Sequence, residues 1–314
     1  MNYELLKLSG LITENSQANF VKIEGGLNSS IQLVEIKNYK YIFKQYSDVN
    51  NAWPRLETEF NFLTLLSEAK VRNVPKAIKK LEDFNIGIYS YLEGKSINEP
   101  TDHNVGSSAS FIIEINNKMK SLKKKVKLAS DYFSDYEGLL SSIHRRIFSL
   151  RKYAPIHNDA YSRAISELEQ TFNNIVKEDN LISKEIRDDI FKVGEVISPS
   201  DFGFHNILQD GDSLKFLDFE YAGTDNVFKL LCDFYCQPRI PISGRQFKKF
   251  VNIINENLVQ VDGLYKASVR LMPIFRLKWA CIILNQINKL EQNRQAKNEQ
   301  IEKALTYLSK KCEE

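Results

Sequence analysis

The stretch that decides the fold is SPSDFGFHN, residues 198–206, together with the segment that follows it. Two short apolar runs come next, separated by the tripeptide DGD at 210–212. An Asp-Gly pair between apolar runs is a strong signal for a β-hairpin. A hairpin turns the chain back on itself, so we expect Asp218, twelve residues after Asn206, to lie close to Asn206.

The residue types in this stretch suit phosphoryl transfer. Asp201 and Asn206 stand five residues apart on a predicted loop, and Asp218 ends the hairpin. In phosphoryl transfer one carboxylate orients or deprotonates the attacking hydroxyl, while an amide and a second carboxylate hold Mg²⁺ against the phosphates. A simpler interpretation is that Asp201 caps a turn after Pro199 and that Asn206 opens a strand. The spacing of Asp201 and Asn206 alone does not separate these interpretations.

The order of predicted elements divides the chain into two lobes, residues 1–95 and 96–314. The first lobe has strands, then a helix, then another strand, and the second is mainly helical around the hairpin. The predicted fold class is therefore α+β, with a small β-rich N-terminal lobe and a larger helical C-terminal lobe. We expect strands over 20–24, 31–36, 40–46, 86–92 and 192–197, a helix over 55–69, and mainly helical stretches over 104–192 and from 228 to the end.

Lys44 is predicted on a strand among apolar neighbours, where a buried ammonium group needs an acidic partner. The helix that begins at Arg55 offers one. At about 100° per residue, Glu59 falls inside the arc of apolar residues on this helix, whereas Glu57 falls outside it. We therefore expect an ion pair between Lys44 and Glu59, of the kind with which kinases position the phosphates of ATP. The alternative is two independent charges at the edge of the lobe.

A glycine-containing loop precedes Lys44. The segment GGLNSS, residues 25–30, lies between two predicted strands, and its backbone N–H groups are suited to covering phosphates. A glycine pair in a hairpin is a weak signal by itself. The signal gains weight from its place in the order of glycine loop, strand lysine, helix glutamate, Asp-x₄-Asn and final aspartate.

Together these motifs resemble the aminoglycoside phosphotransferase/choline kinase family, the small-molecule branch of the protein-kinase-like fold. The similarity is strongest over residues 193–239, and a weaker match covers 20–97 through EGGLNSS, YIFKQY, RLETEFNFL and YSYLEG. The resemblance implies a bilobal kinase that uses ATP and Mg²⁺ to phosphorylate a hydroxyl group of a small polar molecule. A sugar and an amino alcohol both stay open as acceptors.

The resemblance also implies roles, position by position. Asp201 is similar to the catalytic base, and Asn206 and Asp218 are similar to the Mg²⁺ ligands. The nucleotide site implied by the resemblance comprises Lys44 and Glu59, the loop residues Gly25, Gly26, Asn28 and Ser29, and a hinge facing adenine that is formed by Ser90, Tyr91 and Leu92.

Two positions depart from the family pattern. The family has His-Gly before the catalytic aspartate, where this chain has Pro199-Ser200, which puts the geometry of the loop in doubt. Protein kinases have Asp-Phe-Gly where this chain has Asp218-Phe219-Glu220, and the chain has no Ala-Pro-Glu segment. The second departure favours a small-molecule acceptor over a protein. The first keeps open an alternative function, that of a nucleotide-binding pseudokinase with a regulatory role.

Neighbouring polar and aromatic residues have simpler interpretations. We interpret His205 as a residue that packs the loop, and Asp233 as a structural cap for it. The rings of Tyr221, Tyr235, Phe275 and Trp279 are candidates for binding a cationic head group. Aromatic residues at helical spacing belong more often to the core.

Composition excludes several other classes. The chain has 314 residues with 43 Lys and Arg against 40 Asp and Glu, a formal net charge of +3, which is too weak for a nucleic-acid binder. The lysines between residues 118 and 127 scatter around a predicted helix, so we expect a solvated surface.

The beginning of the chain shows no signal-peptide pattern and no stretch is long enough to span a membrane, so we expect a cytoplasmic protein. The four cysteines, which lack metal-site spacing, are expected to be free thiols. Nothing in the sequence indicates the oligomeric state.

Overall fold

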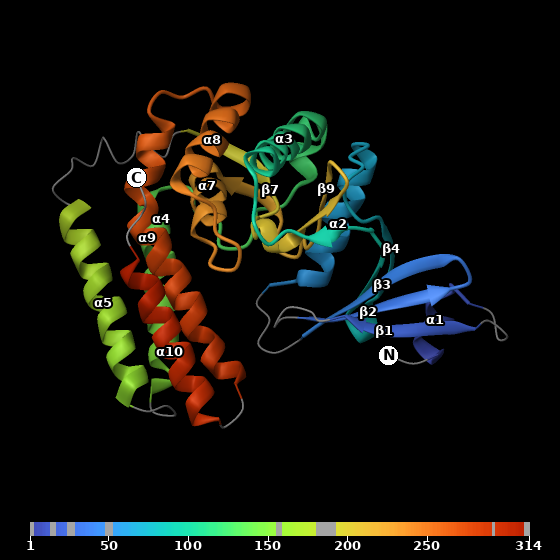
Figure 1. Ribbon diagram of the computed structural model, residues 1–314, viewed down its shortest axis with the longest axis horizontal. Helices are drawn as coiled ribbons and strands as arrows, with labels where there is room; N and C mark the ends of the chain where they lie inside the picture. Colours follow the sequence, from blue (N-terminus) through green and yellow to red (C-terminus); the bar gives the residue numbers. More distant parts are fainter. Residues whose placement is uncertain are drawn as a thin grey trace.

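The computed structural model describes the chain in seven ranges: residues 3–12, 17–23, 29–47, 53–154, 159–179, 193–290 and 293–310. Figure 1 shows two lobes, a small one containing the N-terminus and the blue strands, and a large one built mostly of helices. The expected α+β architecture with a β-rich N-terminal lobe and a larger helical C-terminal lobe is confirmed.

The N-terminal lobe is an antiparallel five-stranded sheet with two helices. Its strands lie in the order β1-β2-β3-β5-β4, so the central strand β3 is paired on both sides. The elements of this lobe are α1 (Tyr3–Ser9), β1 (Ala18–Ile23), β2 (Ser29–Ile36), β3 (Tyr39–Tyr46), α2 (Arg55–Glu68), β4 (Ala77–Leu81) and β5 (Ile86–Ser90).

The C-terminal lobe surrounds two small sheets with helices. One sheet pairs β10 with β7, and the other has the order β6-β8-β9. The strands are β6 (Lys95–Ser96), β7 (Glu195–Ser198), β8 (Ile207–Asp210), β9 (Ser213–Phe216) and β10 (Gly223–Asn226). The helices are α3 (Asp102–Lys118), α4 (Tyr136–Arg151), α5 (Asp159–Asp179), α7 (Val227–Cys236), α8 (Gly244–Ile254), α9 (Leu264–Asn285) and α10 (Arg294–Ser309).

The expected hairpin is confirmed. Strands β8 and β9 pair antiparallel from Ile207↔Phe216 to Asp210↔Ser213. Gly211 in the turn has φ +57°, a left-handed conformation that glycine adopts at little cost. The hairpin brings the residue before Asp218 back to the start of β8.

Two details differ from the sequence expectations. Strand β4 was not expected, because Lys79 and Lys80 interrupt its apolar pattern; it lies at the edge of the sheet, where such side chains reach solvent. The lysine-rich stretch is not one helix: α3 ends at Lys118, and a 3₁₀ segment follows over Lys120–Lys125. Its lysines are exposed, as expected.

Helix α2 joins the two lobes through its apolar face. Phe62, Leu63 and Leu66 belong to the same buried cluster as the core of the C-terminal lobe. The ring of Phe62 stacks on that of Phe219, with ring centroids 5.5 Å apart. This packing fixes the position of α2, and therefore of Glu59, relative to the segment that carries Asp218.

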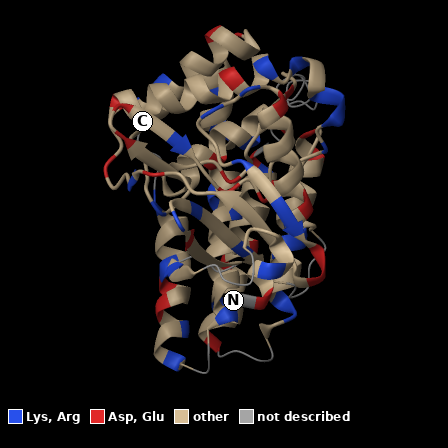
Figure 2. Cartoon of the chain, turned by 90° about the vertical axis from the view of Figure 1, so that its right-hand side faces the viewer, with Lys and Arg blue, Asp and Glu red and all other residues tan. Residues whose placement is uncertain are grey.

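No helix in the described ranges combines the length and the apolar character that crossing a membrane requires. Acidic and basic residues are interspersed over the side of the molecule seen in Figure 2. The described cysteines Cys232, Cys236 and Cys281 are buried free thiols, and Cys312 lies outside the described residues.

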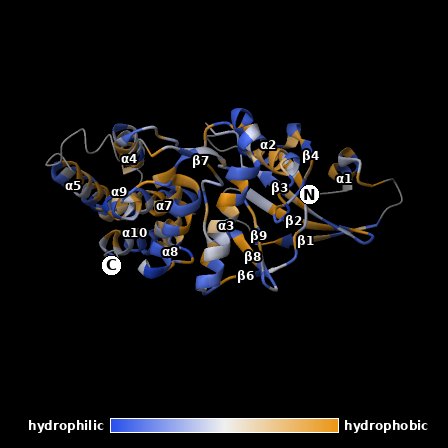
Figure 3. Ribbon diagram, turned by 90° about the horizontal axis from the view of Figure 1, so that it is seen from above, coloured by the Kyte–Doolittle hydropathy of each residue, from blue (hydrophilic) through white to orange (hydrophobic). Residues whose placement is uncertain are grey.

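The centre of the large lobe is aromatic. Phe234 on the strongly hydrophobic helix α7 (Figure 3) is fully buried, and its ring centroid lies 4.1 Å from that of Phe250 and 5.3 Å from that of Phe202. Phe202 directly follows Asp201, so this aromatic cluster anchors the loop that carries Asp201 in the core.

We expect Phe234→Ala to lower the free energy of unfolding by about 3–5 kcal/mol, because it removes a fully buried ring and leaves a cavity. Denaturant titration followed by circular dichroism measures the change. The matched control is Phe148→Ala on α4, whose side chain is 57% exposed and whose loss should change stability by about 0.5 kcal/mol or less. Equal effects of the two substitutions would contradict the assigned core.

Candidate active site

Lys44 lies at the centre of a buried cluster of carboxylates. Its strand, β3, is the central strand of the sheet, and its ammonium Nζ donates to Glu59 Oε2 at 2.8 Å and to Asp218 Oδ1 at 2.6 Å. A third carboxylate, Glu220 Oε2, lies 3.1 Å away. The expected contact between Lys44 and Glu59 is therefore present, and it extends to residues from the other lobe.

Glu59, on α2, contacts residues of both lobes. Its Oε2 atom also accepts a hydrogen bond from the Tyr46 hydroxyl at 2.5 Å, and the Tyr46 and Tyr89 hydroxyls lie 2.7 Å apart. Its Oε1 atom accepts the backbone N–H of Phe219 at 3.2 Å. With these partners a buried carboxylate keeps one position. Glu57, expected outside the apolar arc, instead pairs with Lys80 near the surface.

The cluster is strongly coupled electrostatically. Burial by itself would lower the pKa of Lys44, but Asp218, Glu59 and Glu220 outweigh it and hold this pKa well above its usual value. Burial raises the pKa of Glu220; Lys44 opposes this effect, while the Asp218 and Glu59 carboxylates add to it. With all groups ionised, the three carboxylates, the Lys44 ammonium and the Arg55 guanidinium beside Glu220 carry one net negative charge, which suits a site that takes up a cation.

The oxygen atoms of Glu59, Asp218 and Glu220 lie within 4.8 Å of one another. Carboxylate oxygens are the ligands that Mg²⁺ prefers. Asp218 is the accessible member: its side chain is 35% exposed, whereas that of Glu59 and that of Glu220 are each 4% exposed. Asp218 also has φ +63°, a conformation that costs free energy for a residue with a Cβ atom.

Asp201 lies on the loop between β7 and β8, and its side chain is 31% exposed. Its Oδ1 atom lies 3.3 Å from Nε2 of His205, which is consistent with His205 as a residue that packs the loop. Burial by itself would raise the pKa of Asp201, but the hydrogen bond with His205 and the electrostatic effects of His205, Lys278 and Lys229 hold this pKa below its usual value. Asp201 is therefore ionised at neutral pH.

Asn206 connects the two aspartates. Its side-chain Nδ2 atom donates to the backbone carbonyl of Asp201 at 2.9 Å. The backbone carbonyl of Asn206 accepts the N–H of Leu217, also at 2.9 Å. Leu217 directly precedes Asp218. The structure thus brings together Asp201, Asn206 and Asp218, as the hairpin predicted.

Of the remaining predicted nucleotide residues, Ser29 and Ser90 lie on strands of the sheet, and Tyr91 and Leu92 follow its strand β5. Ser90 ends β5, where its Oγ atom accepts the Lys76 N–H at 2.9 Å; Tyr91 donates its N–H to the Lys40 carbonyl at 3.3 Å; and Leu92 follows half-buried. These contacts hold the connection between the lobes against the sheet. Ser29 begins β2. Gly25, Gly26 and Asn28 lie outside the described residues.

Several residues at the site were not expected from the sequence. Trp53 Nε1 donates to the Glu220 carbonyl at 2.8 Å, and Arg55 Nε donates to the Tyr221 hydroxyl at 3.1 Å. Arg55 also lies 3.6 Å from Glu220 Oε1. They bind the start of α2 to the Asp218 segment. The alternation on β3 could have indicated Tyr46, which shares a face with Lys44, but no sequence pattern indicates Trp53 or Arg55.

Three of the four rings proposed for a cationic head group have other surroundings in the structure. Phe275 and Tyr235 are buried in the core, and the Arg276 guanidinium lies 5.9 Å from the centroid of the Tyr235 ring. Trp279 donates its Nε1–H to Asp233, which also pairs with Lys278. Asp233 thus ties α7 to α9; these partners lie on α9 and not on the loop that Asp233 was expected to cap.

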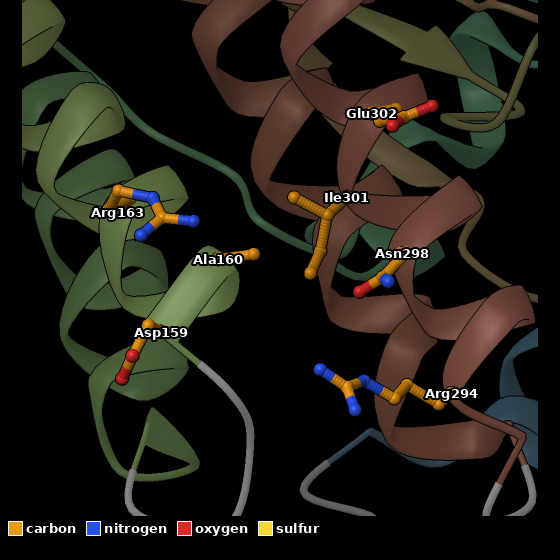
Figure 4. Close-up of a pocket in the computed structure, with 7 residues that line it drawn as sticks. All are labelled: Asp159, Ala160, Arg163, Arg294, Asn298, Ile301 and Glu302. Carbon is orange, nitrogen blue, oxygen red and sulfur yellow. The ribbon is translucent and has the colours of Figure 1, made fainter.

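A separate pocket of about 380 Å³ lies between α5 and α10. Arg163 on one side and Arg294 and Asn298 on the other line it (Figure 4). None of the predicted site residues lines this pocket, so the candidate active site remains the carboxylate cluster and the neighbouring loop.

No family model and no curated protein matches the sequence. Solved structures match over almost the whole chain. Choline kinase from Cryptosporidium parvum has a TM-score of 0.63 at 15% identity, covering 98% of this chain and 95% of its own. Spectinomycin phosphotransferase has the same TM-score and identity, covering 98% and 93%. Macrolide 2′-phosphotransferase from Brachybacterium faecium has a TM-score of 0.62 at 12% identity, covering all of both chains.

These likenesses show the fold. The expected resemblance to the aminoglycoside phosphotransferase/choline kinase family is thus confirmed in architecture, and this chain has the bilobal, protein-kinase-like fold of these phosphotransferases.

Proposed function

We propose that this protein is an ATP-dependent phosphotransferase that moves the γ-phosphate to a hydroxyl group of a small polar molecule. The observation that carries the proposal is the buried Lys44 ammonium, held between Glu59 of one lobe and Asp218 of the other. Solved structures of the same fold support the proposal. Among them is the crystal structure of a spectinomycin phosphotransferase in complex with ADP and spectinomycin.

Each lobe has its own part in the reaction. We assign the nucleotide to the lobe of residues 1–95, with the hinge Ser90–Leu92 facing adenine and the loop containing Gly25 and Gly26 covering the phosphates. The acceptor belongs to the lobe of residues 96–314. Lys44 neutralises the phosphates, and Glu59 keeps the ammonium in place.

Asp201 acts on the acceptor. Its carboxylate accepts the proton of the acceptor hydroxyl, whose oxygen forms a bond with the γ-phosphorus as the bond from that phosphorus to the β,γ-bridging oxygen breaks. ADP leaves, and the proton stays on Asp201 until solvent removes it. The lowered pKa of Asp201 keeps its carboxylate ionised, so that it orients the hydroxyl from the start.

The Asp218 carboxylate and the Asn206 side-chain carbonyl offer oxygen ligands of the kind that Mg²⁺ prefers, and we assign Mg²⁺ to these two residues. A bound Mg²⁺ would neutralise charge on the phosphates. Glu220 is near enough to support Asp218, since both contact Lys44 Nζ.

We seek the acceptor among sugars and amino alcohols. The lysines near Asp201, Lys229 and Lys278, are each paired with a buried aspartate, Asp225 and Asp233, so their charges exclude neither class.

The decisive experiment measures Mg²⁺-dependent ADP release from ATP against a panel of alcohols, sugars and amino sugars. We expect release above the acceptor-free background for at least one class, and its loss when EDTA removes the metal. ATP binding without transfer to any member of the panel would instead support the regulatory pseudokinase.

Asp201→Asn should reduce turnover by about 10³-fold or more, because the amide cannot accept the hydroxyl proton, while nucleotide affinity stays unchanged. ADP release and calorimetric ATP binding measure the two effects. Asp210→Asn, an exposed aspartate of the β8–β9 hairpin, is the matched control and should retain wild-type turnover. Full activity in the Asp201 variant would refute its role.

Lys44→Met should weaken ATP binding and reduce turnover by about 10²-fold, because it removes the cation from the phosphates and takes from Glu59 and Asp218 the counter-charge that they share. Kinetics over a range of ATP concentrations measure both quantities. The control is Lys22→Met, an exposed lysine on the edge strand β1. If the two variants bind ATP equally well, Lys44 does not contact the nucleotide.

A further inference from the structure

The turn before Asp201 is held in an uncommon conformation. Ser200 has φ +69°, and the N–H of Asp201 donates to the carbonyl of Pro199 at 3.0 Å. A hydrogen bond across one residue with positive φ defines a strained type of γ-turn. A residue with a Cβ atom keeps this conformation only where its surroundings impose it. Ser200 is 6% exposed, so those surroundings are protein.

A buried lysine supplies the constraint. Lys229, from the first half of α7, donates from Nζ to Ser200 Oγ at 2.5 Å and to Asp225 Oδ2 at 2.6 Å. Lys229 is 2% exposed and Asp225 is fully buried. A buried ammonium needs acceptors, and glycine at position 200 would supply none from its side chain. The serine hydroxyl therefore completes the coordination of the lysine while the lysine fixes the serine.

The anchor of this contact is rigid. Asp225 lies on β10, which pairs with β7 through Asp225↔Val196, and β7 leads directly into the turn. The Ser200 N–H donates to Ser198 Oγ at 2.9 Å. The turn is thus fixed to the sheet on one side and to α7 on the other, and Asn206 holds the Asp201 carbonyl from the opposite side.

We propose that Lys229, acting through the hydroxyl of Ser200, is a positioning residue that sets the orientation of the Asp201 carboxylate for phosphoryl transfer. The proposal rests on the function proposed above. It explains how a chain with Pro199-Ser200 before its candidate base, in place of His-Gly, keeps that base in a defined position: the constraint comes from α7.

Kinetics of Ser200→Ala, Lys229→Met and the double variant test the proposal, with Ser108→Ala as the control. Ser108 is a buried serine of α3 whose hydroxyl, among the residues that the structure describes, bonds within its own helix, to the Asn104 carbonyl. We expect Ser200→Ala, Lys229→Met and the double variant each to lower kcat by about tenfold or more, because small misplacements of a catalytic group are costly. The KM for ATP should stay within about twofold of the wild-type value.

The double-mutant cycle distinguishes positioning from general destabilisation. If Lys229 acts through Ser200, the double variant should be no slower than Lys229→Met alone, because both substitutions break the same contact. Multiplicative losses, or unchanged kcat in Ser200→Ala, would overturn the proposal. Lys229→Met leaves Asp225 buried without its cation, so Ser200→Ala, which preserves that ion pair, decides the question if the methionine variant does not fold.

Hydrogen exchange separates this proposal from the proposed function. Peptides covering residues 199–206 should exchange faster in Ser200→Ala than in wild type or Ser108→Ala, whether or not an acceptor is phosphorylated. A wild-type protein that transfers phosphate to no acceptor would refute the proposed function, and exchange alone would then test whether Lys229 holds the turn. Unchanged exchange would overturn the contact, and faster exchange with unchanged kcat in an active enzyme would overturn the positioning role.

Discussion

The arrangement of the two lobes depends on one buried ammonium group. Lys44 comes from the central strand of the small sheet, and its partners come from α2 and from the segment after β9. Burying an unpaired charge costs several kcal/mol, so the lysine and its carboxylates are stable only when all these elements are in place. The candidate active site is thus also a point at which the lobes are joined, and its geometry follows from their packing.

The rest of the site is arranged around this constraint. Glu59 is kept in place by the Tyr46 hydroxyl and by the backbone N–H of Phe219, while Phe62, on the same helix, stacks on Phe219. Asp201 and Asp218 remain partly exposed next to this rigid interior. A buried layer of ion pairs and hydrogen bonds next to accessible carboxylates is the arrangement that preorganised catalysis requires, because little has to move when charge develops.

The charged groups inside the large lobe form a second layer of pairs. Lys229 with Asp225 and Lys278 with Asp233 are each buried at 2.6 Å. Both lysines lie on helices that pack together, and both contribute to the lowered pKa of Asp201. Such pairs add little net stability compared with apolar residues, but breaking one is costly, so they restrict the core to one arrangement.

The sequence by itself determined the two-lobed α+β organisation, the β8–β9 hairpin, and the proximity of Lys44 to Glu59 and of Asn206 to Asp218. These features follow from periodicity and turn chemistry, which act over a few residues. The edge strand β4 and the contacts of Trp53, Arg55 and Glu220 were decided by tertiary structure, because they join residues more than a hundred positions apart or depend on the place of a strand in the sheet. The same holds for Lys229: a lysine within an apolar helix signals a buried partner, but only the packing of α7 against β7 and β10 determines that the partner includes the turn before Asp201.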